Sequence, residues 1–382
     1  MDDAIDIKLK LFQLPEIDND ILKSNFNICI STFQAQPLCS LGFNYYFHQS
    51  YDKFSDIVKN QKSDFFWIIN NFEVFLTDPD NKLELVNKSE MYLKAKHKCF
   101  NSNIFYKFWD ILTLLVILED YSVNILVGNK SDIQTTLELF INNIVKLNKK
   151  QYRLDFVTTD YNCCIIDFDF DFNTKTAETD YFVDIIEHIV IGLDNLKNNG
   201  LLIVKIGDMY TQPTIKCLML LNCIFKNVFV YKPYYSKAVD SEKYILCKQF
   251  NKQHYDIIAK KLKKSIDLMK EKKKSNYIID FMSDIPSIKT LDLVITYINL
   301  LIGGTQHKEK NKIITYIESE NYFGLEYQTF ATKQLKSIEF FISNYYPITI
   351  DNFNEILKKN AKALNVNNNF IKMFLETKKI IY

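Results

Sequence analysis

Two ionisable side chains in the middle of the chain, Lys205 and Glu242, have positions that suit acid–base chemistry. Lys205 directly follows the apolar burst Leu201–Val204, and Glu242 shortly precedes the apolar run Ile245–Cys247. Each run is too short for a helix but has the length of a buried strand. Because open α/β sheets place their chemistry in the crevice beyond the carboxyl ends of their strands, both residues are candidates for a functional site.

The elements around these two residues read as half of an open α/β sheet. Gly200 suits a tight turn before the first apolar burst. Thr211 and Pro213 begin a helix, since proline is tolerated in the first helical turn. A second apolar burst, Val228–Tyr231, follows that helix. The predicted order of strand, helix, strand, loop and strand is typical of an α/β fold.

Several short motifs accompany these elements. They are Leu196-Lys197-Asn198-Asn199-Gly200, the strand-end Lys205, Phe225-Lys226-Asn227-Val228, Lys232-Pro233 and Ser241-Glu242-Lys243-Tyr244. In this combination the stretch from Leu196 to Phe250 resembles the C-terminal half of the FtsJ (RrmJ-like) family of ribose 2′-O-methyltransferases. The resemblance covers about residues 104–250. It implies a Rossmann-like methyltransferase sheet that is mostly parallel and has an antiparallel last strand.

An upstream lysine extends the resembling pattern. An amphipathic helix predicted over Ile104–Leu118 carries Lys107 within the sequence Phe-Tyr-Lys-Phe-Trp-Asp-Ile. The family has its first catalytic lysine on a similar helix, which implies that role for Lys107. Without the family, a lysine at this position is more often a solvated helix residue.

An aspartate completes the pattern. The predicted strand Tyr161–Asp167 is similar to the family strand that ends in the catalytic aspartate, and the match falls on Asp167. The following residues alternate phenylalanine with aspartate, which by itself indicates an exposed strand with acids on one face. Asp169 and Asp171 therefore compete with Asp167 for the same role.

The resemblance implies transfer of a methyl group from S-adenosylmethionine to a ribose 2′-hydroxyl. The hydroxyl must lose its proton as it attacks, so a base is required. A lysine can be this base only if burial and a neighbouring positive charge lower its pKa. The implied roles are the base for Lys205, the neighbouring charge for Lys107, orientation of the lysine amine for Asp167, and contact with the second lysine or the hydroxyl for Glu242.

The family binds S-adenosylmethionine at a glycine-rich turn after its first strand, because the cofactor lies directly on the backbone there. Here the strand predicted over Val123–Gly128 is followed by Asn129, Lys130, Ser131 and Asp132, and the family's Pro-Gly-Gly is absent. Gly128 and Asn129 are the candidates for contact with the cofactor. Asp132 would project toward the place of the cofactor's carboxylate.

The segment between this turn and the aspartate strand is short. Thirty-four residues separate Gly128 from Asn162, which is room for one helix and one strand when loops take roughly two to six residues. Active relatives usually fit two strands here, with acids that hold the cofactor's ribose and adenine. Asp155 or Asp160 is the candidate substitute. These departures leave a second hypothesis open, namely a methyltransferase-fold subunit that has lost the cofactor pocket and binds or stimulates an RNA-capping or RNA-processing partner.

Composition limits the classes of partner. The chain has 382 residues and a net charge of +1, which excludes nucleic-acid binding by bulk charge but not by a local basic face. Arg153 is the sole arginine, so RNA contacts would rest on lysine charges and aromatic stacking. The 8 cysteines show no spacing typical of a zinc site, so we expect no metal. With no signal-peptide pattern and no apolar run long enough to cross a bilayer, we expect a soluble, cytoplasmic protein.

We predict three regions, which are an N-terminal extension over residues 1–100, a methyltransferase domain over 101–250 and a helical region over 251–382. In the first region Tyr45, Tyr46 or Trp67 is a candidate for stacking on the methylated guanine of an mRNA cap, although aromatic runs are usually core side chains. The Leu38–Phe47 stretch and the helical tail are similar to family members of large cytoplasmic DNA viruses. This similarity implies capped mRNA as the RNA partner, a capping-complex protein as a second partner, and a place in the cytoplasm, viral factory or virion.

The helical region contains a lysine-dense segment. A helix predicted over Gln253–Lys274 has an apolar stripe, and its other faces carry lysines. Lys260 and Lys264 are candidate contacts for an RNA backbone, or else part of a solvated face. Further along, Gly303-Gly304 is predicted to break the helix that includes Leu291–Leu301.

Overall fold

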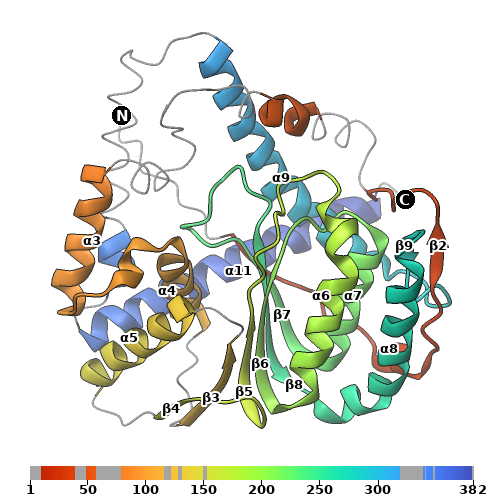
Figure 1. The fold of residues 1–382 in the computed structure, drawn as a ribbon, viewed down its shortest axis with the longest axis horizontal. Coiled ribbons are helices and arrows are strands. Elements are labelled where there is room, and N and C mark those ends of the chain that lie inside the picture. Colours follow the sequence, from red (N-terminus) through yellow and green to blue (C-terminus); the bar gives the residue numbers. More distant parts are fainter. Residues whose placement is uncertain are drawn as a thin grey trace.

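The computed structural model describes residues 10–38, 49–56, 79–115, 122–127, 131–148, 153–318, 339, 341–346 and 349–380. Its centre is a seven-stranded sheet with the order β1-β7-β8-β6-β5-β3-β4 (Figure 1). The strands are β1 (Leu11–Gln13), β3 (Ser122–Val127), β4 (Arg153–Phe156), β5 (Tyr161–Ile166), β6 (Leu196–Ile206), β7 (Phe225–Tyr231) and β8 (Lys243–Phe250). A separate two-stranded sheet pairs β2 (Cys29–Ser31) with β9 (Tyr277–Asp280).

Strand direction agrees with the predicted fold class. Strands β3, β4, β5 and β6 run parallel, and β8 is antiparallel to both of its neighbours, β6 and β7. The last long strand of the chain is therefore inserted antiparallel between two parallel ones. Strand β1 adds an antiparallel edge beside β7. The prediction of a mostly parallel Rossmann-like sheet with an antiparallel last strand is confirmed.

Helices cover both faces of the sheet. One layer holds α6 (Ala177–Asp194), α7 (Gln212–Ile224) and α8 (Lys252–Lys272), and the other holds α4 (Asn103–Leu115) and α5 (Ser131–Asn148) (Figure 1). The central strands are apolar on both faces, as in parallel sheets covered on both sides. In β6, Leu202 and Val204 face the first layer, whereas Ile203 faces the second.

The amino end of β6 contains the predicted tight turn as an irregularity within the strand. Leu196 pairs with Tyr161 of β5, but the next pair joins Leu201 with Cys163, so β6 has extra residues there. Asn199 adopts a left-handed conformation with a φ of 62°. A Cβ on Gly200 would lie 2.7 Å from the carbonyl oxygen of Lys197, so glycine is needed for this close backbone approach.

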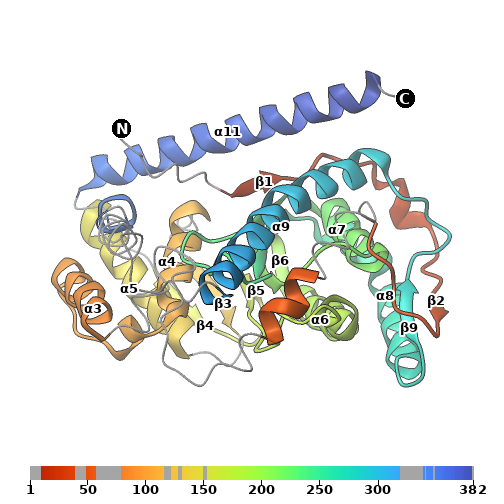
Figure 2. The same cartoon turned by 90° about the horizontal axis from the view of Figure 1, so that it is seen from above.

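Two long C-terminal helices pack on the α/β body. They are α9 (Lys289–Glu318) and α11 (Ile350–Ile380), and α11 crosses the molecule beside β1 (Figure 2). The side chain of Asn367 on α11 donates to the Leu11 carbonyl at 2.9 Å. The remaining helical segments with printed bounds are α3 (Pro79–Leu93), η1 (Asn19–Lys23) and η2 (Lys98–Asn101). None of the described helices combines the length and apolarity needed to cross a membrane.

The predicted helix break at Gly303-Gly304 is wrong. Helix α9 continues through both glycines to Glu318. Glycine in a helix costs only about 1 kcal/mol relative to alanine, and buried side chains on either side of the pair, Ile302 and Gln306, hold the helix against the body. Tertiary packing therefore overrides the local signal.

Candidate active site

The four charged residues predicted to form one site converge at the carboxyl end of β6. Lys107 Nζ on α4 lies 2.7 Å from Glu242 Oε1, and Lys205 Nζ lies 3.2 Å from Glu242 Oε2. Lys205 Nζ is also 3.5 Å from Asp167 Oδ1, just after β5. Glu242, directly before β8, thus bridges the two lysines. The structure brings the tetrad of Lys107, Asp167, Lys205 and Glu242 together.

The tetrad is largely withdrawn from solvent. The side chains of Lys107, Lys205, Asp167 and Glu242 are 12%, 14%, 2% and 10% exposed. Burial on its own would raise the pKa of Glu242, but attraction to Lys107 and Lys205 and hydrogen bonds from Lys107 and Ser236 outweigh it and hold this pKa well below its ordinary value. Glu242 therefore stays ionised and holds both amines.

Asp167, rather than either of its acidic neighbours, faces Lys205. Asp169 and Asp171 are exposed, and the segment after Ile166 is a loop rather than the alternative exposed strand. Tyr244, in the Ser-Glu-Lys-Tyr motif, is buried with its hydroxyl 3.4 Å from Asp167 Oδ1. Lys205 Nζ also donates to the Phe168 carbonyl at 3.0 Å, so the start of this loop orients the amine from a third side.

The loop that carries Glu242 is held by two buried lysines. Lys232 Nζ donates to the carbonyls of Asp240 and Glu242 at 2.6 and 3.0 Å. Lys243 Nζ donates to the Ser241 carbonyl at 2.7 Å and pairs with Asp208 at 3.1 Å. Burial lowers the pKa of Lys232 to about 7, and the neighbouring Lys243 adds to this effect.

A serine adds a direct contact to the same carboxylate. Ser236 Oγ donates to Glu242 Oε1 at 2.5 Å. Sequence reasoning assigned no role to Ser236, Lys232 or Lys243, although both lysines stand in the motifs that carry the family resemblance. Their clustering beside Glu242 in the sequence was the available signal.

A buried carboxylate fixes the helix of Lys107. Asp110, one turn further along α4, accepts from the Tyr231 hydroxyl and from the Tyr234 backbone amide, both at 2.7 Å. Burial raises the pKa of Asp110 to about 7, although these hydrogen bonds oppose the shift. This contact joins α4 to the end of β7, so Lys107 and the Glu242 loop are held in a fixed relation.

Helix α9 reaches the same rim with polar side chains. Asn299 donates to the Met209 carbonyl at 2.7 Å, and Gln306 donates to the Val239 carbonyl and to the Tyr51 hydroxyl, both at 2.8 Å. The Tyr51 hydroxyl in turn lies 3.3 Å from Asp208, next to Lys243. The helical C-terminal region therefore contacts the loops that hold the tetrad. The three-region division of the chain stays a prediction.

The predicted cofactor residues lie apart from the tetrad or outside the described residues. Gly128 and Asn129 lie outside the described residues. Asp155 lies within β4, opposite Asn124 of β3, and three strand positions separate β4 from β6 in the sheet order. At roughly 4.8 Å per strand, that separation is about 14 Å.

The described segment around β3 and β4, where the cofactor of the resembling family would bind, is short. Val157–Asp160 alone join β4 to β5, and β4 is the one strand among the described residues between α5 and β5. Asp160, with a φ of 56°, turns the chain into β5 and lies at that strand's amino end. The carboxylate of Asp155 is an acceptor whose chemistry suits the hydroxyls of S-adenosylmethionine, whereas Asp132, in the first turn of α5, would oppose the cofactor's carboxylate.

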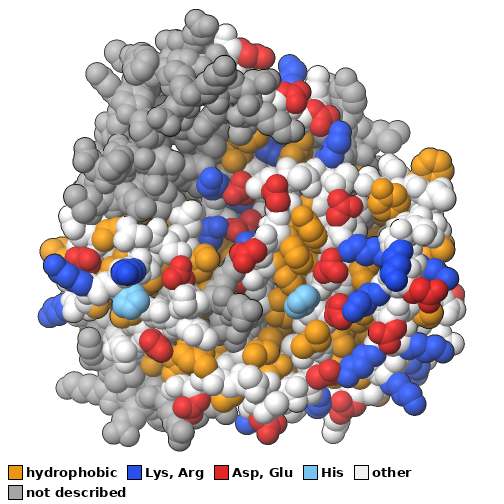
Figure 3. Space-filling model, viewed as in Figure 1, with side chains coloured by type: hydrophobic (Ala, Val, Ile, Leu, Met, Phe, Trp, Pro, Cys, Tyr) orange, Lys and Arg blue, Asp and Glu red, His pale blue; other side chains and the backbone are white. Residues whose placement is uncertain are grey.

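The other predicted contacts have mixed outcomes. Tyr45, Tyr46 and Trp67 lie outside the described residues. Lys260 and Lys264 are exposed on α8, and their role in RNA binding stays a prediction. Figure 3 shows the basic side chains over α8 interspersed with acidic ones. Three of these lysines pair with acids of α6, as Lys263–Asp194, Lys270–Glu187 and Lys273–Asp184. No cluster suited to a metal ion occurs among the residues that the structure describes.

Comparison with known proteins agrees with this geometry. Cap-specific mRNA (nucleoside-2'-O-)-methyltransferase 2 of Drosophila melanogaster is 35% identical over 69 residues, which are 18% of this chain and 10% of that protein. The protein of the same name from Pongo abelii is 34% identical over 83 residues, covering 21% and 11% of the two chains. An uncharacterized protein of Acanthamoeba polyphaga mimivirus is 26% identical over 250 residues, covering 61% and 62%.

These similarities are partial in extent. The chain spans about a tenth of the length of the cap methyltransferases and less than two thirds of the mimivirus protein. The FtsJ-like methyltransferase family matches residues 110–250. This matching region holds three of the four converging side chains, so the chain is similar to the FtsJ-like methyltransferase family there.

Proposed function

We propose that the protein is an S-adenosylmethionine-dependent RNA 2′-O-methyltransferase that acts on the mRNA cap region. The observation that carries the proposal is the convergence of Lys107, Asp167, Lys205 and Glu242 in one largely buried cluster. The partial similarity to cap-specific mRNA methyltransferases supports capped mRNA as the substrate class.

The tetrad can hold a ribose hydroxyl and remove its proton. S-adenosylmethionine, when bound, supplies the methyl group, and Asp155 is the described residue that would hold it. Lys205 Nζ is placed to accept the proton of the attacking 2′-hydroxyl, with Glu242 and Asp167 beside it. Lys107, paired with Glu242, can orient the hydroxyl oxygen.

Several groups together position Lys205 Nζ, the proposed base. The Phe168 carbonyl, Asp167 and Glu242 contact Lys205 Nζ from different elements of the rim. Such preorganisation is worth more than the presence of the base alone, because a misplacement of about 1 Å can cost on the order of 100-fold in rate. The buried lysines behind Glu242 support the same geometry.

Methyl transfer from labelled S-adenosylmethionine to capped RNA tests the proposal. Lys205→Ala should lower the rate by about 10²- to 10⁴-fold, the usual contribution of a positioned base. Lys248→Ala is the matched control, since Lys248 lies near the other end of β8, and it should retain the wild-type rate. A Lys205→Ala protein as active as the wild type would contradict the assignment of the base.

The second candidate function is a methyltransferase-fold subunit without a cofactor, which binds or stimulates an RNA-capping partner. The four-residue connection from β4 to β5 favours it, because relatives usually place a further strand there. Calorimetric titration of S-adenosylmethionine into the pure protein distinguishes the two functions. Saturable heat supports the enzyme, and its absence together with no methyl transfer supports the subunit.

A further inference from the structure

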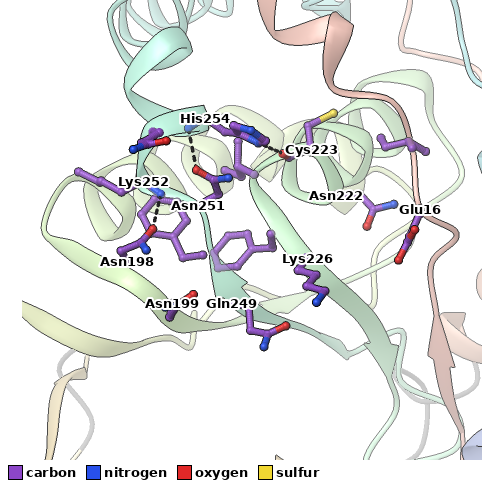
Figure 4. Close-up of a pocket in the computed structure, with 15 residues that line it drawn as sticks. Glu16, Asn198, Asn199, Asn222, Cys223, Lys226, Gln249, Asn251, Lys252 and His254 are labelled. Atoms are coloured by element: carbon purple, nitrogen blue, oxygen red, sulfur yellow. Dashed lines mark hydrogen bonds between the residues drawn. The ribbon is translucent and has the colours of Figure 1, made fainter.

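A groove at the opposite end of the sheet from the tetrad has no role in the proposed reaction. Its cavity volume is about 870 Å³, and its walls come from the amino ends of β6 and β7, the end of β8 and the first turn of α8 (Figure 4). Asn199 in its wall and Lys205 in the tetrad are six residues apart along β6. At roughly 3.3 Å per residue, the two sites are about 20 Å apart.

The groove is lined by side-chain amides with unused hydrogen-bonding groups. Asn222 is 8% exposed, and its amide nitrogen donates to the Pro15 carbonyl. Its carbonyl oxygen has no partner among the described residues and lies on the side of Lys226 (Figure 4). Gln249 accepts from Asn227 through its oxygen at 3.0 Å, which leaves its amino group as a donor. The groove therefore offers both acceptors and donors.

Two of the lining residues have a strained backbone. Asn199 and Gln249 both have a φ of 62°, and they are two of the four non-glycine residues with positive φ in the described part of the chain. This conformation costs on the order of 1 kcal/mol for a residue with a side chain, and such strain is concentrated at functional sites. The two residues lie along the same side of the groove (Figure 4).

An unpaired strand edge borders the same groove. Strand β1 ends at Gln13, and the last backbone bond on this side of β7 runs from Leu14 N to the Val228 carbonyl. Because strand positions alternate, the backbone N–H and C=O of Lys226 point to the same side as those of Val228. The next partner in register would be Glu16, but after Pro15 no backbone bond joins Glu16 to Lys226, both of which the structure describes.

The chemistry of the groove favours a polypeptide over a nucleic acid. Its two phenylalanines, Phe225 and Phe250, are 2% and 1% exposed, so neither ring is open for stacking on a base, and the His254 ring is tied to the Cys223 carbonyl at 3.0 Å. Amides and an open strand edge suit the alternating N–H and C=O groups of an extended peptide. Lys226 and the positive end of α8 favour an acidic side chain on that peptide, and Glu16 at the far wall opposes one there.

We propose that this groove binds an extended, acidic segment of a partner protein, which adds to the edge of β7 at Lys226 and bonds to the surrounding amides. The site is independent of the methyl-transfer reaction, because it lies at the other end of the strands. The segment docks with an Asp or Glu side chain beside Lys226.

Selection of random linear peptides displayed on phage against the full chain tests the site. Peptides rich in Asp or Glu should be enriched on the wild type. A synthetic copy of an enriched peptide should bind at least tenfold more weakly to Lys226→Glu in fluorescence anisotropy. Lys274→Glu, an equal charge change on an exposed lysine beyond α8, should bind within twofold of the wild type.

A second variant and a second measurement test the groove without relying on the Lys226→Glu charge reversal. Asn199→Gly removes an amide while tolerating the φ of 62°, and it should also weaken binding. Hydrogen exchange of the Lys226 amide should slow when the peptide is added. Absence of acidic enrichment, peptides indifferent to both groove variants, or a 12-nucleotide oligouridine that binds with the same sensitivity to Lys226→Glu would each overturn the proposal.

Discussion

The two halves of the sheet's carboxyl rim differ in how much chemistry they hold in place. At the β6–β8 rim, the tetrad side chains are at most 14% exposed, and two buried lysines and a serine support Glu242. At the β3–β4 rim, β4 has 4 residues and is followed by a four-residue link to β5. The β6–β8 rim, which would hold the methyl-accepting ribose, is thus fixed by many contacts. The described β3–β4 rim, which would hold the cofactor, is short.

This difference indicates which part of the site requires precise positioning of its side chains. A proton-accepting lysine requires sub-ångström placement, so each of its contacts is itself anchored. Cofactor binding draws on many weaker contacts and tolerates a reduced set. The two proposed functions differ only in whether the β3–β4 rim still binds S-adenosylmethionine.

The largest effect is expected from removing the carboxylate that bridges the two lysines. Glu242→Ala leaves Lys107 and Lys205 buried without this shared partner, and breaking a buried ion pair costs about 3–5 kcal/mol. Urea unfolding should show this loss in the free energy of unfolding. Glu242→Gln keeps the shape and should lose less; a Glu242→Gln protein as stable as the wild type would mean that the charge is unimportant.

A somewhat smaller, pH-dependent effect is expected at Asp110, which joins α4 to the end of β7. The pKa of Asp110 is raised to about 7, so its stabilising contribution is present in full below the unfolded pKa near 4 and is lost as pH rises through 7. The wild type should lose up to about 4 kcal/mol of unfolding free energy over this range from Asp110. Asp110→Asn should flatten that part of the profile in urea unfolding between pH 4 and 8. An unchanged slope would show that Asp110 ionises normally.

The smallest effect is expected at the β3–β4 rim. Asp155→Asn should weaken S-adenosylmethionine binding by roughly tenfold in calorimetry, which corresponds to one hydrogen bond to a charged group. Asp160→Asn, at the amino end of β5, is the control and should bind like the wild type. If neither variant differs from the wild type while binding persists, the cofactor is held by other residues and the contrast between the halves weakens.

The sequence was sufficient for strands β3 to β8 and for the convergence of the tetrad, but not for the edge strand β1. Short apolar bursts and the positions of Lys205 and Glu242 predicted strands that end at a common rim, and the motif resemblance supplied Lys107 and Asp167. Periodicity alone could not choose among Asp167, Asp169 and Asp171. The choice depends on the loop that begins at the end of β5 and turns the two later acids to solvent.

The supporting residues could not be predicted, because they contradict the usual preferences of their side chains. Lysines are rarely buried, so Lys232 and Lys243 read as solvated residues until the carbonyls around them are known. Asp110 lies in an amphipathic helix and reads as part of its polar face, yet it is fully buried against Tyr231. Such positions are set by tertiary contacts between elements far apart in the chain.

The course of α9 has a consequence for where the molecule can be divided. A chain cut after Phe250 would keep all four side chains of the tetrad and the whole central sheet. It would nevertheless lose the helix whose Asn299 and Gln306 bond the Met209 and Val239 carbonyls, on either flank of the Lys205–Glu242 pair. The C-terminal helical region therefore supports both segments that carry Lys205 and Glu242, and a fragment that ends at Phe250 would lack these contacts.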